Sequence, residues 1–208
     1  MKETKPNILF AALKLFNENG FVNVRLQHIA DEANVSIGNL AYHFPTKKDI
    51  LAKVYEELVQ RQVELLNDLN IVPLFENLDR HWTTVFEIQS EYAFFYQDTL
   101  EITRFDESIR EKYRAHIHWE KEQYIRLLQF NISRGALQPI DEAGLARTAE
   151  HIWLAENSWL HYASISGQEE FKVGAFKDLM WQIFSPHFSH IGKQEYDQLI
   201  KNKLIPLT

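Results

Sequence analysis

The residues whose types and spacing could do chemistry gather in one short stretch, Ser36-Ile37-Gly38-Asn39. The amide of Asn39 offers one donor and one acceptor, the arrangement that adenine complements through N7 and N6 in the major groove. Ile37 can contact the methyl group of thymine, and Gly38 lets one backbone approach another closely. Hydrogen bonding and apolar contact to base edges are therefore the predicted chemistry, with double-stranded DNA as the partner.

Two short helices would position these residues. Apolar side chains at intervals of three and four predict a helix over 26–33, with Leu26, Ile29, Ala30 and Ala33 on one face. Asn34 tolerates the left-handed conformation that ends a helix, and Ser36 is a good N-cap for a second helix that runs to about Phe44. The segment at about 25–44 thus predicts two helices joined by a short turn, in which the start of the second lies nearest the bases.

The flanking sequence completes a small helical domain. Pro45 prevents simple continuation of the second helix, and Thr46 with Asp49 forms a capping pair that opens a longer helix. Upstream, a helix over about 4–19 carries an apolar stripe of Ile8, Leu9, Ala12, Leu13, Leu15 and Phe16. We therefore predict an N-terminal three-helix domain over 1–48.

A set of positions in this domain resembles a known family: Gly20-Phe21, Ile29-Ala30, Val35-Ser36, Gly38, Leu40, His43-Phe44-Pro45 and Lys47. In residue type and register they resemble the helix-turn-helix of the TetR family of transcriptional regulators. The resemblance implies that Tyr42 and Lys47 contact phosphates, which fix register without reading sequence, with His43 beside them and Arg25 as a further contact.

Three positions depart from the family pattern. Arg25 stands where the family usually has a capping Thr or Ser, Asn34 replaces the usual Gly, and Ala41 replaces a usual Tyr. We expect the change at Ala41 to alter packing beneath the recognition helix. None of these departures removes a group that would face DNA. The alternative interpretation is an ordinary helical hairpin, with Lys47 and Lys48 as a solvated helix start.

The charge is distributed unevenly along the chain. The net charge is −7, yet residues 1–50 hold six Lys or Arg against five acids, and the remainder holds sixteen against twenty-four. An acidic body that carries a slightly basic end is repelled from DNA except in one docking orientation. The small number of basic residues also predicts weak nonspecific binding.

Composition excludes several classes of protein. The chain has no cysteine, which excludes disulfides and thiolate metal sites, and it has no apolar run as long as a membrane span. The sequence lacks a nucleophile elbow, a phosphate-binding glycine loop and an HExxH motif, so nothing supports catalysis or a cofactor. We expect a cytoplasmic protein without membrane association.

The rest of the chain shows only helical patterning, which predicts an all-α protein. We assign residues 49–208 to a larger regulatory and dimerisation domain, with 46–69 as the connecting helix. The further predicted helices cover about 74–90, 91–105, 106–134, 141–166, 168–190 and 194–203.

Aromatic side chains are dense in this larger domain, and their usual role is to pack a core. The family resemblance instead implies a cavity for a small apolar or aromatic ligand. The candidate lining residues are Phe86, Tyr96, His116, Trp119, Gln123 and Trp153.

The segment 141–190 carries apolar stripes on two predicted helices: Leu145, Ala149, Ile152, Leu160, Phe176, Leu179, Met180 and Ile183. Two such helices from each of two subunits would form a twofold four-helix bundle, a symmetry that matches a palindromic operator. The alternative is that both helices close the core of one subunit.

His116-Ile117-His118, with Glu120 and Glu122, places His/Glu pairs four residues apart, a spacing that can chelate a metal on a helix. The two histidines point about 200° apart and cannot share a metal without other ligands.

Taken together, the predicted helix-turn-helix, the family resemblance and the paired helices favour a ligand-responsive homodimeric repressor. The alternative is an all-helical metal-dependent enzyme or ligand carrier that no longer binds DNA.

Overall fold

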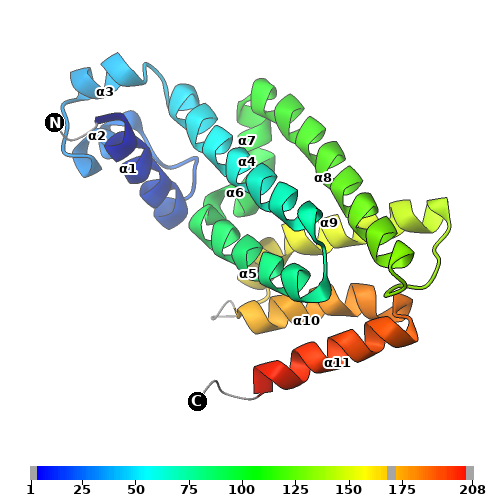
Figure 1. The fold of residues 1–208 in the computed structure, drawn as a ribbon. Coiled ribbons are helices and arrows are strands. Elements are labelled where there is room, and N and C mark those ends of the chain that lie inside the picture. Colours follow the sequence, from blue (N-terminus) through cyan, green and yellow to red (C-terminus); the bar gives the residue numbers. More distant parts are fainter. Residues whose placement is uncertain (1–3, 168–171, 205–208) are drawn as a thin grey trace. The chain divides into compact units, whose positions relative to one another are not determined.

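The computed structural model describes residues 4–167 and 172–204, with side chains described as far as Leu199. Every regular element within these ranges is a helix (Figure 1), which confirms the all-α prediction. The elements are α1 Thr4–Asn19, α2 Leu26–Glu32, α3 Ile37–His43, α4 Lys47–Ile71, α5 Phe75–Glu91, α6 Ala93–Gln97, α7 Thr99–Phe105, α8 Glu107–Ser133, α9 Glu142–Ile165, α10 Val173–Phe184, the 3-10 turn η1 Ser185–His187 and α11 His190–Leu204.

These helices form two compact units. The first unit comprises the described residues of Met1–Arg61 and Ile88–Arg114, and the second unit those of Gln62–Glu87 and Ala115–Thr208. Helices α4, α5 and α8 each contribute residues to both units. The division predicted at residue 48 follows the order of the chain, whereas the contacts group α6 and α7 with the N-terminal helices.

The first unit is closed by the apolar faces of its short helices. The predicted stripe of α1 packs inward through Ile8, Leu9, Ala12 and Phe16, while Leu13 and Leu15 are half-buried. The ring of Phe16 lies 5.3 Å from that of Phe21 and 5.2 Å from that of Phe94, measured between centroids. The α1 stripe thus holds both the loop that follows it and α6.

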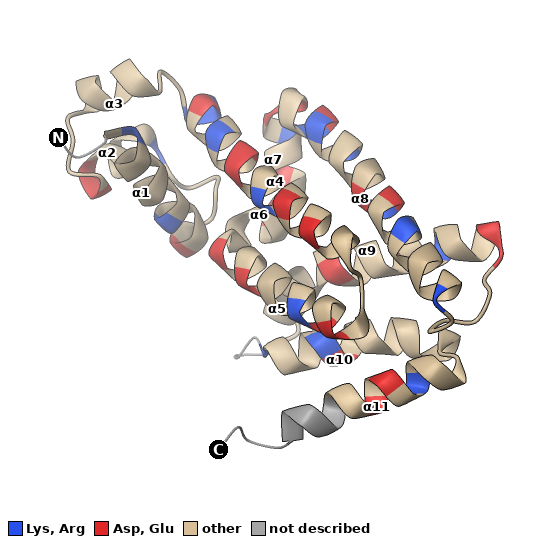
Figure 2. Cartoon of the chain, in the orientation of Figure 1, with Lys and Arg blue, Asp and Glu red and all other residues tan. Residues whose placement is uncertain are grey.

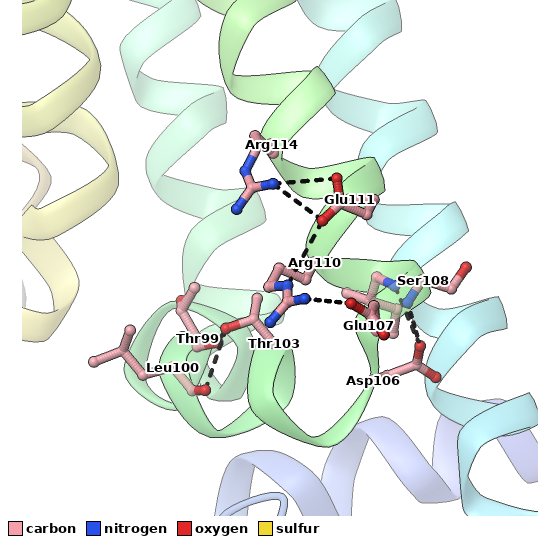
Figure 3. A network of polar contacts seen from close by, with 10 residues as sticks. Thr99, Leu100, Thr103, Asp106, Glu107, Ser108, Arg110, Glu111 and Arg114 are labelled. Atoms are coloured by element: carbon pink, nitrogen blue, oxygen red, sulfur yellow. Dashed lines mark hydrogen bonds and ion pairs between the residues drawn. The ribbon is translucent and has the colours of Figure 1, made fainter.

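Asp106 caps the start of α8 at the junction of α7 and α8. Its carboxylate accepts hydrogen bonds from the backbone N–H groups of Ser108 (2.9 Å) and Ile109 (3.3 Å), as Figure 3 shows for Ser108. Beyond the cap, Figure 3 shows Arg110 and Arg114 paired with the acids of the same helix. These pairs are exposed, so they contribute little to stability beyond support of the helix.

Two predicted helices are interrupted in the structure. The helix predicted over 91–105 is divided into α6 and α7 at Asp98, whose carboxylate accepts a hydrogen bond from the backbone N–H of Phe21 instead of capping α7. The helix predicted over 168–190 begins at Val173 and becomes a 3-10 turn at Ser185, because Pro186 cannot donate a helical hydrogen bond. Residues 168–171 of that prediction lie outside the described residues.

The second unit is built around stacked aromatic rings. Trp82 and Trp181 meet edge to face with centroids 4.9 Å apart, and Phe184 lies 5.4 Å from Trp82. The buried carboxylate of Asp79 accepts a hydrogen bond from the indole N–H of Trp181 and pairs with Lys177 at 2.6 Å. These contacts fix α5 to α10. No helix in the described ranges has the length and apolar character to cross a membrane.

Candidate nucleic-acid interface

The turn between α2 and α3 has the conformation that the sequence predicts. Asn34 adopts φ +54°, the left-handed region, and the N–H of Val35 bonds back to the carbonyl of Ala30 at 3.0 Å. Ser36 then caps α3, because its hydroxyl oxygen accepts a hydrogen bond from the N–H of Asn39 at 3.1 Å. The predicted cap and turn are confirmed, and Figure 1 shows α2 and α3 meeting at this turn.

One face of α3 is buried and the other is open to solvent. Leu40 is fully buried and fixes the helix, whereas Ser36, Ile37, Gly38 and Asn39 are all exposed. The side chain of Tyr42 is 83% exposed although it is a large ring, and it meets the ring of His43 at 5.1 Å between centroids. The helix therefore presents to solvent the side chains that the sequence assigned to DNA.

Charge is absent from the recognition helix itself. Figure 2 shows α3 without Lys, Arg, Asp or Glu, whereas α4 carries both signs. Hydrogen bonding and apolar contact are therefore the only interactions that the side chains of α3 offer to a base edge. Positive charge for phosphates must come from outside α3, and the exposed Arg25 and Lys48 flank the motif in sequence.

The side chain of Lys47, which the family resemblance assigned to a phosphate, has partners within the protein. Its ammonium donates to the carbonyls of Phe21 (2.6 Å), Val24 (2.8 Å) and Val22 (3.4 Å), and it lies 4.1 Å from the centre of the Phe21 ring. Burial lowers the pKa of this ammonium. Since a lysine has three N–H donors and three carbonyls receive them, Lys47 ties the α1–α2 loop to the start of α4.

The departures from the family pattern have local explanations. The backbone N–H of Arg25 donates to Nδ1 of His28 at 3.4 Å, so His28 supplies part of the cap that Arg25 cannot. Asn34 occupies the left-handed position where the family has Gly. Ala41 is exposed, so the expectation that it alters packing beneath the recognition helix is wrong.

Residues distant in sequence also hold the motif, and sequence reasoning missed them. The side-chain amide of Asn17 donates to the carbonyl of Glu91 at 2.7 Å and its oxygen accepts from the N–H of Phe94 at 3.0 Å. Asp98 bonds the N–H of Phe21 at 2.8 Å, as noted above. Each contact joins residues more than seventy positions apart, so no local sequence pattern could have indicated it.

The surroundings of the six predicted ligand-pocket residues can be described one by one. Tyr96 belongs to the first unit and the other five to the second. His116 lies 3.1 Å from the amide oxygen of Gln62 and 3.4 Å from Glu120, and its ring stacks on Trp119 at 5.5 Å. The indole N–H of Trp153 donates to Glu120 at 2.9 Å.

The remaining two predicted pocket residues also have protein partners. Gln123 accepts a hydrogen bond from Asn70 at 3.2 Å, and Phe86 lies 6.0 Å from the ring of Phe176. None of the six lines any of three pockets, of about 250, 390 and 440 Å³, found within the described residues. The six-residue pocket therefore stays a prediction.

The predicted self-complementary stripes are largely used inside one subunit. Leu145, Ala149, Ile152, Leu160, Phe176 and Met180 are buried in the second unit, and Leu179 and Ile183 are half-buried. The exposed apolar residues of α9 are instead Leu154, Tyr162 and Ile165, the last of them 71% exposed. The spacing of these three places them along one side of α9, and the dimer face over 141–190 stays a prediction.

A capped helix-turn-helix with an open, uncharged recognition face, joined to a helical body, defines a DNA-binding regulator. Residues 8–54 match the family model described as bacterial regulatory proteins of the tetR family, and residues 54–196 match the TetR model described as a bacterial transcriptional repressor. The chain therefore belongs to the TetR family of transcriptional regulators.

Known proteins resemble the chain over most of its length. The biofilm operon icaADBC HTH-type negative transcriptional regulator IcaR of Staphylococcus aureus (strain Newman) is 26% identical over 197 residues, which cover 87% of this chain and 97% of IcaR. A TetR-family regulator from Marinobacter aquaeolei VT8 has the same fold, with a TM-score of 0.82, 23% identity and coverage of 97% and 98%.

A further solved structure is a regulator from Saccharomonospora viridis in complex with choline. It has a TM-score of 0.70 and 19% identity and covers 89% of this chain and 97% of its own. At these identities, the solved structures establish the fold alone.

Proposed function

We propose that the protein is a ligand-responsive homodimeric repressor that binds a palindromic operator through α3 of each subunit. The observation that carries the proposal is the exposed face of α3, where a capped helix start and an 83% exposed tyrosine stand free of the protein core. An exposed aromatic ring beside hydrogen-bonding groups offers a partner both apolar contact and hydrogen bonds. DNA in the cytoplasm is the partner that this face suits.

The exposed residues of α3 form two groups according to their position along the helix. Ser36, Ile37, Gly38 and Asn39 lie at the helix start and read base edges, with Asn39 on adenine. Tyr42 and His43 lie a turn further on and contact phosphates, together with the guanidinium of Arg25. These assignments rest on exposure and position along the helix.

We propose that the first role of Lys47 is structural, in the DNA-reading part of the chain (the reader) that α2 and α3 form. Its three donors are engaged by carbonyls, so a phosphate contact would require it to release part of the α1–α2 loop. The exposed Lys48, whose ammonium lies 5.3 Å from the centre of the Phe105 ring, can supply positive charge without that loss.

A second copy of the chain is the partner that the exposed side of α9 fits. The patch of Leu154, Tyr162 and Ile165 would meet the same patch of the partner subunit, as a twofold interface requires. Dimerisation places two readers on two half-sites, and the second binding event then becomes intramolecular. A reader with so little net positive charge depends on this gain.

Control by a small apolar or aromatic ligand follows from population shift. A ligand that binds better to one arrangement of α4 changes the separation of the two readers and hence operator affinity. The complex of the Saccharomonospora viridis regulator with choline supports the proposal that this fold can hold a small molecule. Helix α4 runs from the reader at Lys47 into the second unit.

A footprint on the DNA that flanks the gene of this protein tests the proposal. We expect a protected inverted repeat whose half-sites are centred about one helical turn, roughly 34 Å, or more apart. Protection of a single half-site would contradict the dimer, and the absence of any protected site in flanking DNA would contradict control of neighbouring genes.

A further inference from the structure

Helix α3 has an apolar edge, formed by Ile37 and Ala41. An α-helix turns by about 100° per residue, so Gly38 and Tyr42 lie on the side opposite the buried Leu40. Ile37 and Ala41 are four residues apart and lie together to one side of that line. Both are exposed, Ile37 to 43%. Neither side chain is polar, so this edge offers a base apolar contact alone.

The other side of α3 is a polar edge, formed by Asn39 and His43. Asn39 is exposed, and its side-chain amide has no hydrogen-bond partner within the described ranges. Its backbone N–H, by contrast, donates to the hydroxyl of Ser36 at 3.1 Å and so fixes the start of the helix. His43 is half-buried, so the exposed amide of Asn39 carries the hydrogen bonding of this edge, with both a donor and an acceptor.

An A·T base pair complements both edges. Its major-groove side carries the methyl group of thymine at one end, and the N7 acceptor and N6 donor of adenine at the other. A side-chain amide can pair with that acceptor and donor together, and an apolar side chain can contact the methyl group. The apolar and polar edges lie on opposite sides of α3, just as the methyl group and the adenine lie at opposite ends of the pair.

A G·C pair suits neither edge. Guanine presents two acceptors, O6 and N7, which Arg or Lys reads with two donors, and α3 contains neither residue (Figure 2). The amide oxygen of Asn39 would face an acceptor of guanine with no hydrogen between them. Cytosine has no methyl group, so Ile37 would lose its contact as well. Both edges of α3 therefore discriminate in the same direction.

We propose that α3 reads a half-site core of A·T pairs, with thymine methyl groups against Ile37 and Ala41 and an adenine against Asn39. The half-site core is the set of base pairs that α3 contacts. The helix rises about 6 Å from Ile37 to Ala41, roughly two base-pair steps, so the apolar edge meets neighbouring thymines of one strand. The inference rests on the proposed function, in which α3 enters the major groove, and it specifies the base composition of the operator.

Selection of bound duplexes from a random pool by the full chain tests the composition of the half-site. We expect an inverted repeat in which each half-site core contains consecutive A·T pairs with their thymines on one strand.

Modified bases within the selected site test the contacts. Deoxyuridine in place of one of these thymines removes only the methyl group and should weaken binding about fourfold, as burial of one such group predicts. 7-Deazaadenine removes only the N7 acceptor, so the amide N–H of Asn39 loses its partner and binding should weaken about fivefold or more.

Substitutions in α3 assign each effect to a residue. Ile37→Ala should abolish the effect of uracil at one of these thymines, and Asn39→Ala should bind the adenine and 7-deazaadenine duplexes equally. The matched controls are Ile71→Ala and Asn67→Ala, which make the same changes at exposed positions of α4 and should keep the wild-type ratios.

The inference is overturned if the selected core holds G·C pairs, if uracil leaves affinity unchanged, or if both α3 variants keep the wild-type ratios. The last result would show that A·T pairs are selected for the shape and flexibility of the duplex and not through α3. In each of these cases a specific site is still bound, so the proposed repressor stands. If the pool yields no enriched sequence, the proposed function itself fails, and the inference fails with it.

Discussion

The two units use their polar residues in opposite ways. In the first unit, the side chains assigned to DNA stand in solvent, and the contacts that hold them are hydrogen bonds to loop carbonyls and N–H groups, from Lys47, Asp98 and Asn17. Among the described residues, the first unit buries the polar side chains of Gln89 and Asp106, whereas the second unit buries more of them: Asp79, His81, His116, Glu120, Gln123, Asn131, Thr148 and Glu156.

This difference between the two units indicates which unit makes contact with a partner and which unit can be regulated. An exposed polar face costs little in the free protein and gains its hydrogen bonds when a partner arrives. Buried polar groups are costly unless satisfied, so each one makes the second unit sensitive to ligands, protonation and small shifts of helices. The first unit is therefore a rigid support for contact, and the second is the part whose state can be changed.

The largest effect is expected at the exposed side of α9. Changing Leu154 and Ile165 to Arg would bury unpaired like charges across a twofold interface and should weaken the dimer at least a hundredfold. Sedimentation should show a monomer, and operator affinity should fall with it. Phe130→Arg, at an exposed position on α8, is the control. A double variant that remains dimeric would place the interface elsewhere.

The next effect is expected at Lys47. Lys47→Met keeps most of the stem and removes the ammonium, so the carbonyls of Phe21 and Val24 lose a donor, and the first unit should lose about 1–3 kcal/mol. Hydrogen exchange of the α1–α2 loop and α2 measures the loss. Lys48→Met is the matched control, because its exposed ammonium has no hydrogen bond to the part of the chain that the structure describes. Equal exchange in both variants would refute the architectural role.

The buried titratable groups of the second unit should make the stability of the folded protein depend on pH. Burial raises the pKa of Glu156 from 4.5 to about 8, while Tyr124 donates a hydrogen bond to it. Between those values the folded protein keeps a proton that the unfolded chain has lost, so this group makes stability fall as pH rises. His81 acts oppositely: from about pH 3 to 6.5 the unfolded chain binds a proton that the folded protein refuses, and stability rises.

Only the Glu156 effect remains above pH 6.5, so stability should fall by about 2 kcal/mol at most between pH 6.5 and 8. Urea unfolding followed by tryptophan fluorescence measures this effect, because all five tryptophans belong to the second unit. Glu156→Gln retains an acceptor for Tyr124 and should abolish the fall. An unchanged slope in that variant would assign the pH dependence to other groups.

A smaller effect is expected at the cap of α3. Ser36→Ala removes the acceptor for the N–H of Asn39 and should cost about 1 kcal/mol of local stability. Exchange of the Asn39 amide hydrogen should accelerate about fivefold, while the amides of α9 serve as the internal reference. A variant that exchanges like wild type would show that the turn at Asn34 alone holds the helix.

Local signals made much of the fold predictable. The caps at Ser36 and Thr46 were recognisable because a short polar side chain before an apolar period commonly caps a helix. The left-handed turn at Asn34 was predictable for the same reason. Exposure of the α3 face followed from burial of Leu40 on the opposite side.

The failures share a physical cause, which is competition from tertiary contacts. Asp98 bonds to Phe21 instead of capping α7, and Lys47 bonds to loop carbonyls. The α9 stripes illustrate the same limit: periodicity identifies an apolar face, but it cannot tell whether Ile152 or Ile165 meets the core of its own subunit. The surroundings of His81 were equally unpredictable, because its burial without a hydrogen-bond partner among the described residues is visible only in the structure.

Operator affinity of Asn39→Ala and Tyr42→Ala, measured by gel shift on the footprinted site with sedimentation of the same samples, tests the central claim most directly. Asn67→Ala, an exposed asparagine on α4, is the control. We predict that each α3 variant loses about 1–3 kcal/mol of operator binding, roughly tenfold to a hundredfold, while remaining dimeric and folded. Normal operator binding by both variants would contradict the account, because the exposed face of α3 would then have no part in reading DNA.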